Sequence, residues 1–219
     1  MTGLGARLQR GAAELLPSSL VVFHGPREAR RIALTFDDGP EQLLGEYLDA
    51  LERFSARATF FVLGECLAVR REGVYEMIRR GHEVASHGYS HKRFTLMTRG
   101  ELDDELDRTD ALLPVSRAPR PLLRPPQGAT NLRSLVRCAR RGYTTVLWSL
   151  DSDDCRTEDP RVVAERCAPE RVTPGEIVLL HEGQRWTLEA LPQLLAGLSG
   201  AGYALVTVGE LLAGAGNGG

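Results

Sequence analysis

Short apolar runs alternate along this chain with longer segments in which apolar residues recur at helical spacing. Compact apolar runs predict buried strands, and apolar residues three and four positions apart predict helices. The runs that predict strands span 32–36, 58–63, 82–86, 122–124, 143–150, 177–180 and 203–208. The segments that predict helices span 40–54, 74–80, 99–113, 132–141, 160–167 and 187–198.

Local signals mark where several of these helices begin or end. Pro40 suits the first position of the helix at 40–54. Thr98 and Glu101 have the spacing of a capping box, Asn131 suits an N-cap, and Gly81 suits the residue just after a helix. Alternating strands and helices with short links predict a parallel sheet, open or closed into a barrel. In both architectures the active site lies at the carboxyl ends of the strands.

Polar side chains follow five of the predicted strands at the point where each strand ends. These residues are Asp37 and Asp38, His87 and His91, Arg124, Asp151 and Asp154, and His181. Because the carboxyl ends of parallel strands meet at one edge of a sheet, we expect these side chains to lie together. The occurrence of all five clusters at strand ends is a more specific signal than any single cluster. It predicts a catalytic site at this edge of the sheet.

The residue types in these clusters indicate a metal site. Asp37 and Asp38 are adjacent carboxylates, which are costly to hold as anions unless a cation lies nearby. Acids at a strand end also occur in phosphoryl-transfer enzymes and as helix caps. His87 and His91 lie four residues apart, and with Asp38 they form a set of two histidines and one carboxylate. Such a set suits zinc, cobalt or another first-row divalent metal.

Size and composition fit one globular domain. The chain has 219 residues, and we expect a single catalytic domain over 1–219 with a core at about 22–212. Spaced leucines predict an N-terminal helix at 4–16, and the glycine-rich residues 213–219 predict a flexible tail. The net charge of -2 gives no electrostatic case for nucleic acid, and no apolar run has the length of a transmembrane segment.

The N-terminus and the cysteines bear on the cellular location. Charged residues interrupt the first 25 residues, so no apolar core of a secretory signal is visible. We therefore expect a cytoplasmic protein, with a peripheral position at a membrane as the alternative. The cysteines are Cys66, Cys138, Cys155 and Cys167, which form no CxxC pair and are expected to be free thiols.

Five motifs together resemble a known family. TFDDGP, SHGYSH, RPPQG, WSLDSDDC and LLH occur in the order and approximate spacing of the NodB-type polysaccharide deacetylases, carbohydrate esterase family four. The resemblance runs over about residues 22–212. It implies a distorted (β/α) barrel of about seven parallel strands and a metal-dependent hydrolysis of the N-acetyl group on sugars. It also implies one divalent metal, zinc in the first place, held by Asp38, His87 and His91.

The same resemblance implies roles for the other polar residues. Asp37 would be the general base that takes a proton from the attacking water, and Arg124 would hold and orient it. His181 would be the general acid that protonates the departing amine. Asp154 would pair with His181 and raise its pKa, and Asp151 would shape the same loop.

The residues expected to form the substrate pocket depart from the family pattern at two positions. Gln127 stands where an aromatic residue is usual, and Cys155 where tryptophan is usual. Backbone N–H groups at Gln127 and Gly128 suit an oxyanion site. We favour a position in the pocket for Cys155 over a role as a further metal ligand, because the set of three metal ligands is already complete. The expected pocket residues are Gln127, Gly128, Asp151, Cys155, Leu179 and Tyr89, and Trp186 either stacks on a sugar ring or packs at a helix start.

Three functions compete on this reading. The first is a metal-dependent hydrolase that removes an N-acyl group, in the first place N-acetyl, from an amino sugar, an oligosaccharide or a glycoconjugate. The second is a related amidohydrolase that acts on a small amide or on a lipid-linked or nucleotide-linked sugar, which the lost pocket aromatics favour. The third is a non-catalytic relative that binds glycans. The complete sets for base, metal and acid argue against the third.

Overall fold

The fold is described from a computed structural model that covers residues 20–114 and 120–214. The helix predicted at 4–16 and residues 215–219 of the predicted tail lie outside this described part of the chain. Within the described part, no helix is both long enough and apolar enough to cross a membrane.

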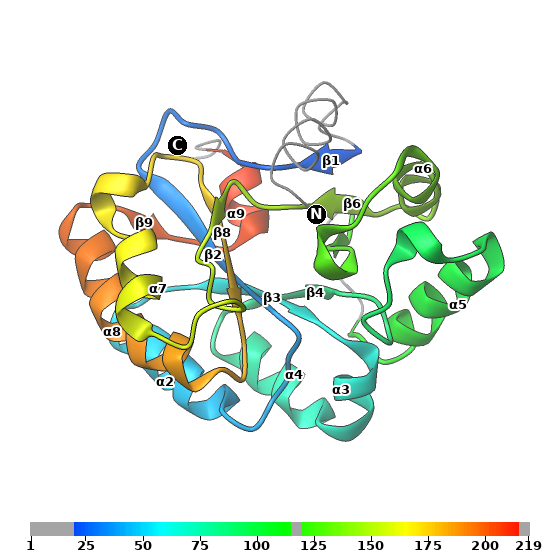
Figure 1. Ribbon diagram of the computed structural model, residues 1–219, viewed down its shortest axis with the longest axis horizontal. Helices are drawn as coiled ribbons and strands as arrows, with labels where there is room; N and C mark the ends of the chain where they lie inside the picture. The colour runs from blue at the N-terminus through cyan, green and yellow to red at the C-terminus, as the bar shows by residue number, and fades with distance from the viewer. Residues whose placement is uncertain (1–19, 115–119, 215–219) are drawn as a thin grey trace.

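A curled parallel sheet forms the centre of the molecule (Figure 1). Its spatial order is β1-β6-β5-β4-β3-β2-β8-β7, and β9 pairs with the beginning of β2. The strands are β1 Val21–Val22, β2 Arg31–Asp37, β3 Ala58–Val62, β4 Glu83–Ser86, β5 Leu122–Leu123, β6 Thr144–Val146, β7 Leu150–Asp151, β8 Ile177–His181 and β9 Ala204–Leu205. All pairs of these strands are parallel. The predicted distorted (β/α) barrel is confirmed as a half-barrel, with nine strands among the described residues rather than about seven.

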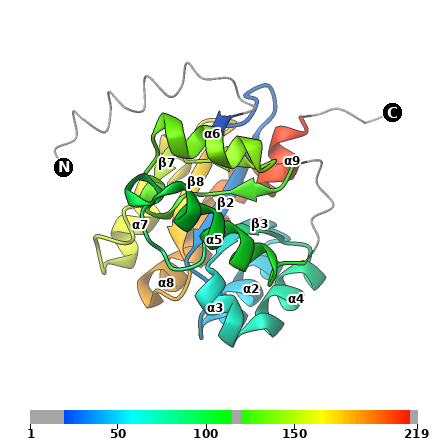
Figure 2. The same cartoon turned by 90° about the vertical axis from the view of Figure 1, so that its right-hand side faces the viewer.

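Helices surround the sheet in an arc from α8 through α2, α4 and α3 to α5 (Figure 1). Their bounds are α2 Leu44–Arg53, α3 Gly64–Val69, α4 Arg71–Arg79, α5 Arg99–Asp110, α6 Leu132–Arg140, α7 Pro160–Arg166, α8 Arg185–Gly200 and α9 Val208–Leu212. Three short 3₁₀ turns are η1 Phe94–Leu96, η2 Pro126–Gly128 and η3 Pro169–Arg171. Figure 2 shows α5 and α6 as neighbours, and the ion pair between Asp103 and Arg137 joins them.

The central strands are buried on both faces. Every residue of β3 is buried, as is every residue of β2 after Arg31. On one side they pack against α2 and α8 through residues such as Phe36, Leu48 and Leu191. Parallel strands covered on both faces read as continuous apolar runs, which is why their positions could be predicted from the sequence.

The prediction of one continuous strand over 143–150 is wrong, because this segment crosses from one edge of the half-barrel to the other. The N–H of Leu147 still donates to Val22 O at 2.8 Å, next to β1 and β6. Two residues later, the N–H of Ser149 donates to Ile177 O at 3.0 Å on β8. The run therefore divides into β6 and β7, which lie near opposite ends of the strand order. This short crossing brings the two edges of the curled sheet together.

Two further boundaries differ from prediction for local reasons. The helix expected from Pro40 begins only at Leu44, because the N–H of Glu41 is held by Glu182 Oε1 at 2.7 Å in a turn beside β8. The strand expected at 203–208 is shortened to β9, because Thr207 caps α9 in a capping box with Glu210.

Candidate active site

The polar residues that follow the strands do meet at one edge of the sheet. Asp37 at the end of β2 is in register with His181 at the end of β8. His87 directly follows β4, and Arg124 directly follows β5. The fold therefore brings together groups from four strands, as their position in the sequence predicts.

Asp38, His87 and His91 form a compact group with the geometry of a metal site. Asp38 Oδ1 lies 3.5 Å from His87 Nε2 and 3.3 Å from His91 Nε2. One ligand atom from each of the three residues lies within 4.8 Å of the others. Asp38 Oδ1 is buried and has no hydrogen-bond partner among the described residues. A buried carboxylate oxygen without a donor fits a site that is completed by a cation.

The environment of His87 leaves its Nε2 atom free to ligate. The His87 ring is buried, and Nδ1 lies 2.8 Å from Arg124 O. A carbonyl oxygen can only accept, so Nδ1 carries the proton. Burial lowers the pKa of His87 and outweighs the opposing effect of Asp37 and Asp38, which keeps the ring neutral. The Nε2 lone pair therefore points toward Asp38, as in a histidine oriented by an outer hydrogen bond.

The loop that carries His91 is held from α5 by Glu105. Glu105 is buried, and its Oε2 accepts the backbone N–H groups of Tyr89 at 2.8 Å and Ser90 at 2.9 Å. Its Oε1 accepts the Ser90 hydroxyl at 2.5 Å. His91 has φ of 58°, and Asp38 has φ of 77°. Both angles are unusual for residues with a side chain, and such positions persist where their surroundings fix them.

Asp37 and Arg124 form a buried ion pair beside this group. Arg124 Nη1 donates to Asp37 Oδ1 at 2.7 Å and to the Thr35 hydroxyl at 2.8 Å. The other guanidinium nitrogens donate to the carbonyl oxygens of Val146 and Leu147 at 3.3 and 3.2 Å. The guanidinium is fully buried, and its fixed donors hold Asp37 in one orientation. The other carboxylate oxygen, Asp37 Oδ2, faces the group formed by Asp38, His87 and His91. It lies 3.7 Å from His87 Nε2.

His181 is held as a cation by Asp154. His181 Nδ1 lies 2.7 Å from Asp154 Oδ1, and the backbone N–H of His181 donates to Asp154 Oδ2 at 2.7 Å. Thr187 also donates to Asp154 Oδ2, at 2.9 Å. Burial by itself lowers the pKa of His181, but the hydrogen bond and charge of Asp154 outweigh it and raise the pKa to about 9. At neutral pH the ring is protonated.

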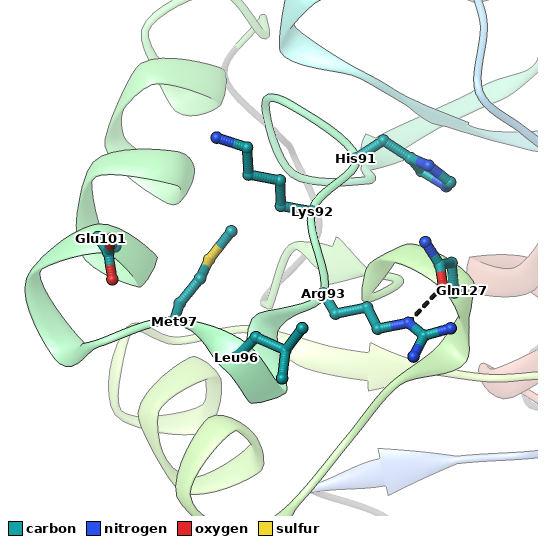
Figure 3. Close-up of a pocket in the computed structure, with 7 residues that line it drawn as sticks. All are labelled: His91, Lys92, Arg93, Leu96, Met97, Glu101 and Gln127. Atoms are coloured by element: carbon teal, nitrogen blue, oxygen red, sulfur yellow. Dashed lines mark hydrogen bonds between the residues drawn. The ribbon is translucent and has the colours of Figure 1, made fainter.

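A cavity of about 460 Å³ opens beside His91 (Figure 3). It is lined by His91, Lys92, Arg93, Leu96, Met97, Glu101 and Gln127. Of the expected pocket residues, only Gln127 lines it, and Gln127 Oε1 accepts a hydrogen bond from Arg93 Nε. Two cationic side chains therefore lie next to one of the three metal-site residues.

The oxyanion role expected at Gly128 is not supported by its hydrogen bonding. The Gly128 N–H donates to Pro125 O at 2.9 Å within the η2 turn, so it is already used. Gly128 has φ of 61°, and an added Cβ would lie 2.6 Å from the Trp148 ring. The glycine is thus required by the turn and by the close approach of Trp148.

The other expected pocket residues lie in different surroundings. Cys155 is exposed next to Asp154 and His181. Asp151 Oδ1 accepts the backbone N–H of Asp153 at 2.9 Å, which shapes the loop after β7. Leu179 is buried within β8, in register with Asp151.

The aromatic residues Tyr89 and Trp186 are packed against neighbouring elements. The Tyr89 ring lies between α3 and α5, with the Arg108 guanidinium 3.5 Å from its centroid. Tyr89 is not among the residues that line the cavity beside His91. Trp186 Nε1 donates to Asp154 O at 2.7 Å, so the indole braces the Asp154 loop from the start of α8.

Sequence reasoning missed four polar residues that support the site. They are Thr35, Glu105, Glu182 and Thr187, all buried. The signal that could have found Glu105 is its place between Leu102 and Leu106 on the buried face of α5. Glu182 holds the Glu41 turn next to Asp38, and burial raises its pKa to about 7. The partners of Thr35 and Thr187 are distant in sequence, so no local pattern predicts them.

The half-barrel with polar groups gathered at the ends of its strands has its candidate site where (β/α)-barrel enzymes carry their active sites. A sequence profile described as polysaccharide deacetylase matches residues 24–146. A peptidoglycan-N-acetylglucosamine deacetylase from Bacillus cereus is 33% identical over 205 residues, which cover 91% of this chain and 96% of the relative. The chain belongs to the NodB-type polysaccharide deacetylase family.

Two further comparisons agree with this family. The peptidoglycan-N-acetylglucosamine deacetylase PgdA of Listeria monocytogenes is 33% identical over 200 residues, or 90% of this chain. The match covers 42% of PgdA, so the chain spans less than half the length of that relative. The crystal structure of the Bc1960 peptidoglycan N-acetylglucosamine deacetylase superposes with a TM-score of 0.83 at 26% identity, covering 89% of this chain and 93% of that one.

Proposed function

We propose that this chain is a metal-dependent deacetylase of N-acetylated sugars in a glycan, with peptidoglycan as the substrate class. The observation that carries the proposal is the convergence of three groups at one sheet edge. They are the ion-paired Asp37, the metal-type set that contains Asp38, and the protonated His181. Removal of an acetyl group from an amine needs a base, a polarising cation and an acid.

Asp38, His87 and His91 would hold the metal. The unpartnered Asp38 Oδ1 and the lone pair on His87 Nε2 support this assignment. When bound, a divalent ion such as zinc or cobalt supplies a Lewis acid that polarises the acetyl carbonyl and acidifies water. The donor set of two imidazoles and one carboxylate leaves coordination positions open, as catalytic sites require.

Asp37 is proposed as the general base. Its Oδ1 is occupied by Arg124, while Oδ2 faces the metal-site residues. The guanidinium fixes the direction of the free oxygen of Asp37. In this position Asp37 accepts a proton from the water that attacks the acetyl carbon.

His181 is proposed as the general acid. Because Nδ1 is bound to Asp154, the proton available for transfer lies on Nε2. The ring is protonated at neutral pH and donates to the nitrogen of the departing amine. Asp154 acts through His181, by fixing the ring and by maintaining its charge.

The cavity beside His91 supports an acidic glycan as the substrate. Lys92 and Arg93 bring two cations to the cavity wall and Glu101 brings one anion, so the wall is positive on balance. Peptidoglycan carries carboxylates on its peptide side chains, so the charges are complementary. The relatives named as peptidoglycan deacetylases support the same class.

The test is acetate release from a substrate panel by the purified chain. The panel contains acidic peptidoglycan fragments, neutral N-acetylglucosamine oligomers, and nucleotide-linked amino sugars, each with zinc, with cobalt or with chelator. We expect metal-dependent release, fastest from the peptidoglycan fragments. Faster release from the nucleotide-linked sugars would favour the related amidohydrolase instead. Metal binding without release from any substrate would favour the glycan-binding relative.

A further inference from the structure

A second group of possible ligands lies on the acid side of the site. Asp154 and Cys155 belong to the loop that follows β7, and His181 ends the neighbouring strand β8. One ligand atom from each of these three residues lies within 4.8 Å of the others. Thiolate, imidazole and carboxylate are all ligands that zinc accepts.

The group is open to solvent on one side. Cys155 is exposed, the His181 side chain is 15% exposed, and the Asp154 carboxylate is fully buried. An ion that arrives from solvent meets the sulfur and the imidazole first, with the carboxylate behind them. It therefore needs no opening of the core to bind.

The charge of the surrounding loop favours a cation. Asp151, Asp153 and Asp154 lie next to Cys155 in this loop. Arg156 lies 3.6 Å from Asp151 and also pairs with Asp153, and Arg166 lies 3.6 Å from Asp153. Asp154 itself is paired with His181 rather than with an arginine. Once the ion displaces a proton from the His181 imidazolium, three carboxylates face only two guanidinium groups, and this negative charge favours the bound cation.

We propose that Asp154, Cys155 and His181 bind a thiophilic divalent ion, separately from the site formed by Asp38 and the two histidines of its loop. Binding forms a bond from the ion to the Cys155 sulfur and another to a His181 ring nitrogen. The thiol proton and one imidazolium proton are released to solvent, so no redox partner is needed. The carboxylate of Asp154 supplies the third bond.

The consequence for turnover rests on the proposed function. With the ion on His181 Nε2, the one proton left on the ring lies on Nδ1 against Asp154, so none is available for the departing amine. Excess zinc is therefore expected to inhibit the enzyme by occupying this second site. The second site thus makes turnover sensitive to inhibition by free zinc or cadmium. The tryptophan that is usual at the position of Cys155 offers no metal ligand and would not allow this inhibition.

The two sites differ in one measurable way, because only the second contains sulfur. We would titrate the metal-free chain with cobalt and follow absorption and bound metal together. A thiolate bound to cobalt gives a charge-transfer band in the near ultraviolet, whereas the two-histidine, one-carboxylate set does not. Two cobalt ions per chain and one such band are expected.

Variants separate the sites. Cys155→Ser is expected to lose the band and one bound ion, whereas Cys66→Ser, which changes another partly exposed cysteine, retains both. His91→Ala is expected to lose one ion and keep the band. Loss of an outer-shell partner alone typically lowers metal affinity about 10–100-fold. Loss of the Cys155 sulfur is therefore expected to raise the zinc inhibition constant at least about tenfold, relative to each variant's own uninhibited rate.

A wild-type chain without the band at saturating cobalt would overturn the proposal, and so would a band that survives in Cys155→Ser. Because the band reports binding and not turnover, it is independent of the proposed function. A chain that shows the band but releases no acetate would contradict the deacetylase assignment and leave the second site standing.

Discussion

At the scale of single residues, the proposed base and the proposed acid are each controlled by one buried partner. Arg124 fixes the orientation of Asp37, and Asp154 sets the charge of His181. Both partners are fully buried, so neither can be replaced without exposing or orphaning a charge. Substitution of each partner gives one prediction, measured as a change in stability for Arg124 and as a change in the pKa of His181 for Asp154.

Arg124→Met is expected to destabilise the fold by about 3–5 kcal/mol, because it leaves the Asp37 carboxylate buried without its cation. Chemical denaturation measures this change. The double variant Arg124→Met with Asp37→Asn removes both charges and is expected to recover part of the loss. Equal destabilisation in the single and double variants would show that packing around the guanidinium, and not the charge pair, determines the effect.

Asp154→Asn is expected to lower the pKa of His181 from its value of about 9, because burial is then opposed only by the charges of Asp37 and Asp38. NMR titration of the metal-free chain measures the pKa directly. In turnover, the protonated ring is the active form, so the rate falls as pH rises through the pKa of His181. The basic limb of the kcat profile should therefore move to lower pH in the variant. An unchanged basic limb would remove His181 from the role of acid.

At the scale of elements, the site depends on a helix that contributes no reacting group. Glu105 on α5 accepts two backbone N–H groups and a hydroxyl from the loop that ends in His91. Glu105→Ala is expected to weaken zinc binding about 10–100-fold, the usual cost of losing an outer-shell contact. Competition with a chelator measures the affinity. Asp104→Ala, at an exposed position of the same helix, is the matched control and should bind zinc normally.

Elements with their own local signals could be predicted from sequence. Thr98 with Glu101 and Asn131 with Ser134 cap α5 and α6 through side chains three residues apart, so the information is local. The strand expected at 143–150 fails because Leu147 and Ser149 pair with opposite edges of the sheet. Apolar pattern alone cannot show such a crossing, since every residue of the run remains suitable for a strand.

At the scale of the whole molecule, strand ends bring the reacting groups together. Asp37 and His181 are 144 positions apart in number yet occupy paired positions on β2 and β8. The sequence could predict which residues end strands, and the parallel arrangement then implies that they meet. It could not predict Thr187, because its role arises from a contact with Asp154, 33 positions away along the chain.

The central claim is that Asp37 is the base of a metal-dependent deacetylase, and one comparison tests it most directly. Acetate release from peptidoglycan fragments is measured for the wild-type chain and for Asp37→Asn, each loaded with one equivalent of zinc. Loss of a general base is expected to lower kcat about 10²–10⁴-fold while zinc remains bound. Asp49→Asn, at an exposed site on α2, should match the wild type. Full activity in Asp37→Asn with zinc bound would contradict the account.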